Sequence, residues 1–150
     1  MSTFAADVAA WALNVEGAIE VIFREAAQEL AREMDLLLEQ TVYDQPISSS
    51  GYQRTGFLRA SLVASSSVMP QLVRENPGTP VPPDLGDVIL VINGAEIGGT
   101  IYLGYTANYA AFVHYSANGQ SGRPWVTMAA QRWEIIVDRV SARVKSRLGL

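Results

Sequence analysis

Histidine, serine and carboxylate side chains could carry chemistry in this chain, and their number and spacing limit that chemistry. The 150 residues include one histidine, His114, and no cysteine. A Ser-His-Asp arrangement needs a positioned nucleophile, but no Gly-x-Ser-x-Gly elbow is present, and Ser116 lies in an expected turn. One histidine without cysteine is also a poor zinc-ligand set. We therefore expect His114 to pack in the core or at an interface, and we predict no catalytic, cofactor or metal site.

Phosphate-binding loops are also missing, whereas carboxylates recur along the first part of the chain. The glycines at positions 94, 98 and 99 fit neither the P-loop nor the dinucleotide-binding spacing. The recurring carboxylates are Glu16, Glu20, Glu25, Glu29 and Glu33. On a helix they form an acidic face that is either solvated or directed at a basic helix or at DNA in a channel. Such a face lets DNA slide, because basic contacts retain phosphates.

The charges of the chain are divided between its two ends. Residues 1–45 hold nine acidic and two basic side chains, residues 123–150 hold six basic and two acidic ones, and the net charge is −4. A negative total argues against a dedicated nucleic-acid binder. The division predicts that the two ends attract each other, either within one chain or between neighbouring chains.

The composition is that of a globular protein, with 49% apolar and 17% charged residues. A chain of 150 residues can bury a continuous core, so we expect one domain over residues 1–150. The first residues lack the basic start of a signal peptide. The longest aliphatic run, Val88–Ile92, is too short to span a membrane. These features predict a soluble protein that is not exported.

Residues 4–43 have the pattern of one long helix, with apolar residues every three or four positions and no proline before Pro46. The apolar positions are Val8, Trp11, Val15, Ile19, Ile22, Ala26, Leu30, Met34 and Leu37. A straight helix of that length measures about 60 Å, whereas a compact domain of this size has a diameter of about 40 Å. We therefore predict a bend near Asn14–Gly17, with residues 1–16 as an N-terminal arm. The alternative is that the first turns project toward a partner.

The middle of the chain predicts short elements joined by loops. Ser48–Gly51 is expected to be a flexible connector, and Thr55 to cap a short helix that ends at Leu62. Val63–Met69 has the composition of a strand. Residues 70–86 contain five of the seven prolines, which predicts an exposed loop without helix or central strand.

Two further strands and a short helix are expected in the next segment. Val88–Ile92 has the composition of a buried strand, Asn93-Gly94 that of a hairpin turn, and Thr100–Tyr105 that of the returning strand. Asn108–Tyr115 is expected to form the short helix, and Ser116–Gly122 a polar turn.

A last helix is expected to begin at Pro124, because proline suits the first helical position. Its predicted apolar face consists of Val126, Ala130, Trp133, Val137, Val140, Val144 and Leu148. The predicted fold class is therefore α+β: a long N-terminal helix, a small antiparallel β-sheet and a long C-terminal helix packed in two layers. Arg139, Arg143 and Arg147 form a basic stripe on the last helix. This stripe either complements the helix dipole or docks against an acidic neighbour.

Two motifs resemble those of the neck, or tail-completion, proteins of long-tailed double-stranded DNA phages. Thr55–Leu62 reads TGFLRASL and is similar to the TG-x-L-R-x-S pattern of these families. Tyr109–Tyr115 reads YAAFVHY, and Gly122–Trp125 reads GRPW, similar to their YA block and (A/G)-R-P-(F/W) pattern. The chain departs from the pattern at Ser116, where a glycine commonly follows the YA block, and residues 70–86 have the character of an insertion.

The resemblance implies a non-enzymatic virion protein at the junction of portal, head-closure ring and tail. Such a subunit would form a homo-oligomeric ring, with six-fold symmetry expected, around the DNA channel. Its partners would be head-closure or portal-side neck proteins and a tail terminator or tail-tube protein. The genome would pass through without sequence-specific binding, and neither a membrane nor a cofactor would take part. The protein would reside in the virion and, during assembly, in the host cytoplasm.

Several residues are candidates for contacts with neighbouring chains. We expect Arg123 and Trp125 at a subunit interface, because both residue types are frequent interface anchors, together with the stripe of Arg139, Arg143 and Arg147. The acidic face of the five glutamates is expected toward the DNA channel or a partner. Three alternatives remain open: a tail terminator that caps the tail tube, a small cytoplasmic binding module, and a hydrolase that uses His114.

Overall fold

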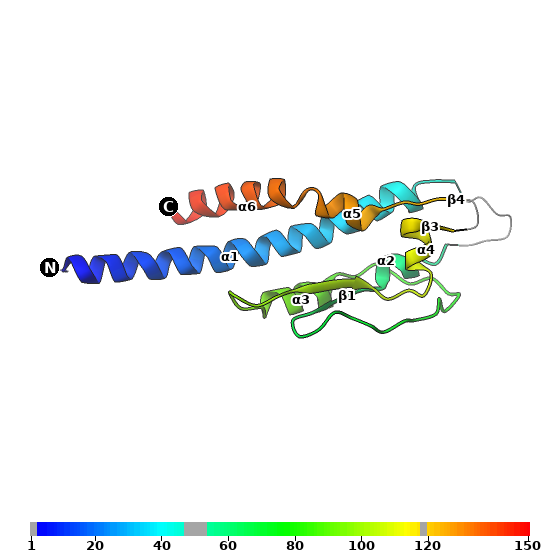
Figure 1. The fold of residues 1–150 in the computed structure, drawn as a ribbon, viewed down its shortest axis with the longest axis horizontal. Helices are drawn as coiled ribbons and strands as arrows, with labels where there is room; N and C mark the ends of the chain where they lie inside the picture. The colour runs from blue at the N-terminus through cyan, green and yellow to red at the C-terminus, as the bar shows by residue number, and fades with distance from the viewer. Residues whose placement is uncertain (1–2, 47–53, 118–119) are drawn as a thin grey trace.

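One long helix forms the axis of the molecule in the computed structural model, which describes residues 3–46, 54–117 and 120–150. This helix, α1 (Phe4–Leu38), has α5 (Trp125–Ala130) and α6 (Trp133–Leu148) along one side. The small sheet and the other short helices lie on its other side (Figure 1). The predicted α+β class, with a long N-terminal helix, a small antiparallel sheet and a C-terminal helix, is confirmed.

Helix α1 is continuous through residues 14–17, so the chain is not broken at the position where a bend was predicted. It begins after Thr3, whose hydroxyl accepts a hydrogen bond of 3.2 Å from the amide of Ala6. It ends in a π-helical turn, η1 (Glu39–Tyr43). Its first turns extend beyond the end of α6 (Figure 1), which is the alternative to a bend.

The sheet pairs two strands that are distant in the sequence. Strand β1 (Leu62–Ser65) runs antiparallel to β2 (Tyr102–Tyr105), with Leu62 opposite Tyr105. Both strands overlap the predicted ones but are shorter. A second, minimal ladder joins β3 (Ser116–Ala117) to β4 (Gln120–Ser121), inside the segment predicted as a polar turn.

The segment predicted as a buried strand is instead the helix α3 (Gly86–Asn93), and the hairpin turn predicted after it is absent. The burial pattern explains the error. A strand would place Val88, Leu90 and Ile92 on one face, but Val88 and Ile92 are buried while Leu90 is 72% exposed. Buried residues four apart fit a helix, and a short apolar run by itself does not distinguish the two.

The other short helices lie close to their predicted positions. Helix α2 (Phe57–Ala60) has Gly56 rather than the predicted Thr55 at its N-cap, and it ends before Leu62, which belongs to β1. The Thr55 hydroxyl still accepts a hydrogen bond of 3.3 Å from the Phe57 amide. Helix α4 (Ala110–Tyr115) lies within the predicted range of residues 108–115. The connector predicted at Ser48–Gly51 lies outside the described residues.

The proline-rich segment, residues 70–86, is a loop as predicted, apart from one anchored position and the start of α3. The anchor is Arg74, whose backbone amide donates to the Thr106 carbonyl over 2.7 Å and whose carbonyl accepts from Asn108 over 2.8 Å. The Arg74 side chain also donates to the Thr106 hydroxyl over 2.8 Å. The loop is thereby tied to the end of β2.

The C-terminal helix is two helices rather than one, because the helical hydrogen bonding is interrupted between Ala130 and Trp133. The interruption changes which residues face inward. Val140 and Val144 are buried as predicted, but the buried residue of the first turn of α6 is Ile136, and Trp133 is 36% exposed. Pro124 precedes α5 rather than forming its first residue.

Two groups of buried side chains hold these elements together. The larger group surrounds Trp125 and Leu37 and includes residues of α1, α2, α3 and α5. The smaller group joins Ala26 of α1 to Ile136, Val140 and Val144 of α6. Among the described residues, no helix combines the length and the apolar character needed to cross a bilayer.

Gly56 offers a test of the turn that begins α2. Its φ is +79°, and a Cβ atom there would lie 2.7 Å from the Val81 carbonyl oxygen. Gly78 has a φ of +77° with open space around it. Gly78→Ala should therefore lower the free energy of unfolding only by the left-handed backbone strain, about 1–2 kcal/mol. Gly56→Ala should lower it clearly more. If chemical denaturation shows equal losses of unfolding free energy for the two variants, the close approach of the Val81 carbonyl to Gly56 is contradicted.

Candidate functional site

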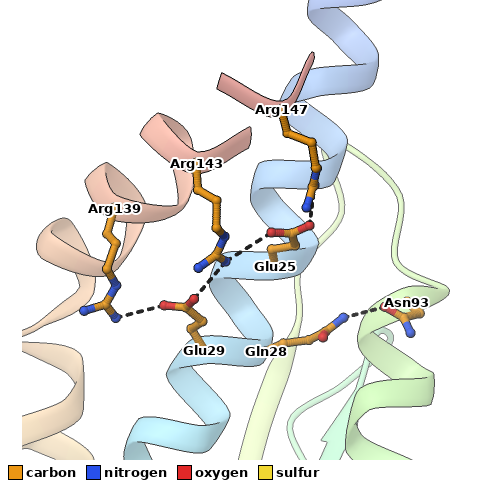
Figure 2. Close-up of polar contacts among 7 residues, drawn as sticks. All are labelled: Glu25, Gln28, Glu29, Asn93, Arg139, Arg143 and Arg147. Atoms are coloured by element: carbon orange, nitrogen blue, oxygen red, sulfur yellow. Dashed lines mark hydrogen bonds and ion pairs between the residues drawn. The ribbon is translucent and has the colours of Figure 1, made fainter. Parts of the chain in front are cut away.

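The polar residues that the sequence analysis singled out meet between α1 and α6 (Figure 2). Arg139 donates to Glu29 over 2.8 Å, and Arg147 donates to Glu25 over 2.6 Å. Arg143 lies between them and reaches both carboxylates, Glu25 at 3.1 Å and Glu29 at 2.8 Å. We call these five residues the Arg–Glu ladder. It aligns α6 along α1 beside the smaller apolar cluster.

Further ion pairs extend the same pattern along α1. Arg132, just before α6, pairs with Glu33, and Arg24 pairs with Glu20 on α1 itself. On the face of α1 turned toward α3, Gln28 donates to Asn93 over 2.5 Å (Figure 2). The attraction expected between the two ends of the chain is therefore found within one chain.

The ladder shifts the ionisation of its carboxylates. Hydrogen bonds from Arg147, and then from Arg143, lower the pKa of Glu25 against the opposing effect of burial. Burial by itself raises the pKa of Glu29, but hydrogen bonds from Arg139 and Arg143 outweigh it, and the pKa is lowered. Both groups are ionised at neutral pH and are satisfied by this chain's own arginines.

These contacts give the charged residues partners within the chain. Arg139, Arg143 and Arg147 were expected to meet a neighbouring subunit, but their guanidinium groups pair inside the chain. Glu25 and Glu29 belong to the same ladder and pair with the arginines of α6. The other three glutamates differ: Glu20 and Glu33 have intrachain partners, and Glu16 is exposed on the first turns of α1.

The two remaining interface candidates lie in different environments. Trp125 is 1% exposed and packs edge-on against Tyr105, with ring centroids 5.1 Å apart, so it is a core residue and not an anchor for a neighbour. Arg123 is half-buried; its amide donates to the Val113 carbonyl over 2.9 Å. Its guanidinium makes no ion pair with any residue the structure describes, so this cation stays a candidate for an intersubunit contact.

His114 lies at the edge of the larger cluster. Its Nε2 is 3.4 Å from both the amide and the hydroxyl of Thr127, and its ring lies edge-on to Trp125. Its Nδ1 is buried without a hydrogen-bond partner. Burial lowers the pKa of His114 below its ordinary value of 6.5. A packed neutral histidine fits these contacts.

A pocket of about 390 Å³ opens beside His114. Its walls include Met34, Leu103, Trp125 and Val126. The Trp125 indole nitrogen and the Tyr105 hydroxyl oxygen lack hydrogen-bond partners, but like His114 Nδ1 they are shielded from solvent. The surface that the pocket offers is therefore mainly apolar. Among the described residues, no group of three carboxylate or histidine side chains could hold a metal ion.

The first of the two motifs is explained by contacts within the fold. Arg59 forms a bidentate pair with Asp35 of α1, at 2.9 and 2.7 Å. Leu58 is buried, and Ser61 is buried with its hydroxyl donating to the Leu58 carbonyl over 2.8 Å. The Asp35–Arg59 pair was not predicted, because no local sequence pattern indicates contact between residues 24 positions apart.

The second motif is also structural. A Cβ atom at Gly122 would lie 2.2 Å from the Tyr115 carbonyl oxygen, so the chain after α4 passes too close for a side chain. Arg123 and Trp125 then lead into α5 through the contacts described above. The residues that carry the resemblance thus hold α2, α4 and α5 in place.

The start of α1 is one of the surfaces that carry exposed apolar side chains. Phe4 is 84% exposed, Trp11 is 62% exposed and Val8 is exposed, while Val15 is half-buried. We call these four residues the N-terminal stripe. They are spaced by four, three and four positions, which places them on one side of the helix. Val8, Trp11 and Val15 are among the periodic apolar positions predicted for the long helix, and their exposure fits the alternative in which the first turns project.

Comparisons of this chain with protein-family models, with curated proteins and with solved structures found no match.

The Arg–Glu ladder should stabilise the monomer. Replacing Arg139, Arg143 and Arg147 together with glutamate would set like charges against Glu25 and Glu29, so we expect a lower thermal midpoint by circular dichroism. Lys145→Glu is the control, because Lys145 lies on the same helix without an ion pair to a described residue. Adding Glu25→Arg and Glu29→Arg should restore part of the loss. High salt should reduce the difference, and an unchanged midpoint would contradict the role of the ladder.

The buried His114 should make stability fall in mildly acidic solution. Its pKa is lower in the folded state than in the unfolded chain, so the unfolded state binds the proton more readily. Stability is thus unaffected above about pH 6.5 and decreases as the pH falls below it toward the folded-state pKa. The thermal midpoint of the His114→Gln variant should change less between about pH 7 and pH 5, the window of this titration, than that of the unchanged protein. The Glu25 and Glu29 effects belong to lower pH, because their pKa values lie below 4.5.

Proposed function

We propose that this protein is a structural, non-enzymatic virion component of the head–tail junction, a tail-completion subunit of a ring around the DNA channel. The observation that carries the proposal is the N-terminal stripe on a helix that projects beyond its own domain. A projecting helix with exposed aromatic residues needs a neighbour to cover it. An assembly of many subunits supplies such neighbours.

The two motifs give independent support. Their residues are used for caps, close approaches and core contacts, so the resemblance concerns the framework of the domain rather than a reactive centre. Arg59 with Asp35, and Gly122 with the Tyr115 carbonyl, are examples of such framework contacts. A shared framework without a shared catalytic group suits a family of structural subunits.

The charge distribution also suits a component that surrounds DNA without gripping it. The basic stripe of α6 is paired with glutamates of α1 instead of being presented to phosphates. A surface whose cations are neutralised in this way has fewer charges to retain DNA. Of the alternatives, a tail terminator is supported by the same observations as the tail-completion subunit. A small binding module is supported only by the projecting helix.

Self-assembly is the first property to measure. Native mass spectrometry over a concentration series, with negative-stain imaging of the same samples, should reveal a closed ring, with six copies expected from the resemblance. Arg123→Ala should lower the ring fraction with little change in the thermal midpoint, because the Arg123 guanidinium has no ion pair within the described part of the chain. Lys145→Ala is the matched control for loss of one exposed cation.

A protein that stays monomeric at every concentration would contradict a self-assembling ring and would favour the binding module. An open filament in place of a ring would contradict closure of the interface. If Arg123→Ala and Lys145→Ala reduce the ring fraction equally, Arg123 has no specific role at the subunit interface.

A further inference from the structure

We infer that the N-terminal stripe is the docking surface for an amphipathic helix of a different protein, a helix with basic residues beside its apolar face. This deepens the proposed function, on which it rests for its setting, by naming the kind of neighbour that the projecting part of α1 engages. The inference follows from the continuity of the stripe with the α1–α6 interface and from the charges around it.

Continuity with the α1–α6 interface indicates that the occupant is a helix. The stripe of Phe4, Val8, Trp11 and Val15 continues in the same three- and four-residue steps into Ala18, Ile22 and Ala26. Ala26 is buried in the cluster formed with α6, and Ile22 packs against that cluster. The line on α1 that α6 covers therefore continues past the last residue of α6. A helix placed end to end with α6 would cover it in the same way.

The uncovered length is that of a short helix. Arg147, in the last turn of α6, reaches Glu25, so the covered part of α1 begins only a few residues before that position. The segment Phe4–Gly17 lies before it and is about 21 Å long at the helical rise. Figure 1 shows this part of α1 extending alone at the N-terminal end.

The charges indicate the kind of helix. Residues 3–17 contain no basic side chain, and Glu16 is an exposed carboxylate there. On the part of α1 that α6 covers, glutamates lie beside the apolar contact residues, and arginines of α6 form ion pairs with them. A helix that repeats the pattern of α6, with apolar residues flanked by arginine or lysine, matches the projecting segment in the same way.

The same charges disfavour other occupants. Two copies of the projecting segment laid side by side would bring no basic side chain to their interface, so neither copy would offer an opposite charge to Glu16 of the other. An anionic lipid surface would be repelled as well, since helices that lie on membranes carry basic polar faces. A basic helix from another chain is thus the occupant that the segment fits best.

The probe for this surface is a fluorescently labelled synthetic peptide that copies α6, Trp133–Leu148, because it has the required pattern. Its binding to the full chain is measured by anisotropy at low salt. Trp11→Ala should weaken binding by about tenfold or more, as for a central aromatic anchor. Leu13→Ala should leave it unchanged, because Leu13 is 68% exposed and lies about 200° around the helix from Trp11.

Two further probes address the other occupants. The peptide with its arginines at positions 139, 143 and 147 replaced by glutamate should bind much more weakly, and a peptide copying residues 4–17 should not bind. Equal binding of the residue 4–17 peptide would overturn the inference in favour of self-pairing. Equal effects of Trp11→Ala and Leu13→Ala would overturn it as well, as would binding to phosphatidylglycerol vesicles that displaces the peptide.

Ring formation, measured on the same samples, separates this inference from the proposed function. A ring without peptide binding would overturn the docking inference and leave the proposed function standing. Peptide binding that depends on Trp11, by a protein that is monomeric at every concentration, would overturn the ring and leave the docking surface standing.

Discussion

The structure depends on the covering of one long helix. Helix α1 is too long for the domain that it organises, and its sides must be buried by elements from the rest of the chain. On one side, Ile136, Val140 and Val144 of α6 pack on it, and the Arg–Glu ladder sets the position of α6 along it. On the other side, α3 is attached through Gln28 and Asn93. The first turns of α1 are left uncovered, and they form the surface that we propose for a partner, so the same constraint accounts for the fold and for this exposed stripe.

The ladder changes the meaning of the charge pattern. A basic stripe on one helix and an acidic face on another suggest two complementary faces of neighbouring subunits, but here both belong to the same pair of helices. The partly buried carboxylates of Glu25 and Glu29 are held ionised by arginines that remain half-exposed. Such pairs contribute modestly to stability, and their clearer effect is to fix the register of α6 on α1. The N-terminal stripe, in contrast, is apolar and exposed, and it is the surface that we propose for docking.

The two motifs are better understood as framework than as a site. Gly56 and Gly122 occupy places where a carbonyl oxygen passes too close for a side chain, and Arg59 joins α2 to α1 through Asp35. Trp125 fills the centre of the larger cluster. These roles require particular residue types at particular spacings, although no chemistry is performed there. A resemblance carried by such residues is informative about architecture first and about function only through that architecture.

The sequence alone determined the elements whose signals are local. The long helix α1, the short helix α4 and the proline-rich loop each depend on neighbours along the chain, and each was predicted. What only the tertiary structure decided was pairing between distant segments. Whether Val88–Ile92 is strand or helix depended on the core that buries Val88 and Ile92 but not Leu90. Whether the arginines of α6 meet a neighbour or their own chain depended on α6 lying along α1. Spacing fixes which residues share a face, but only the packing of the whole chain decides what lies against that face.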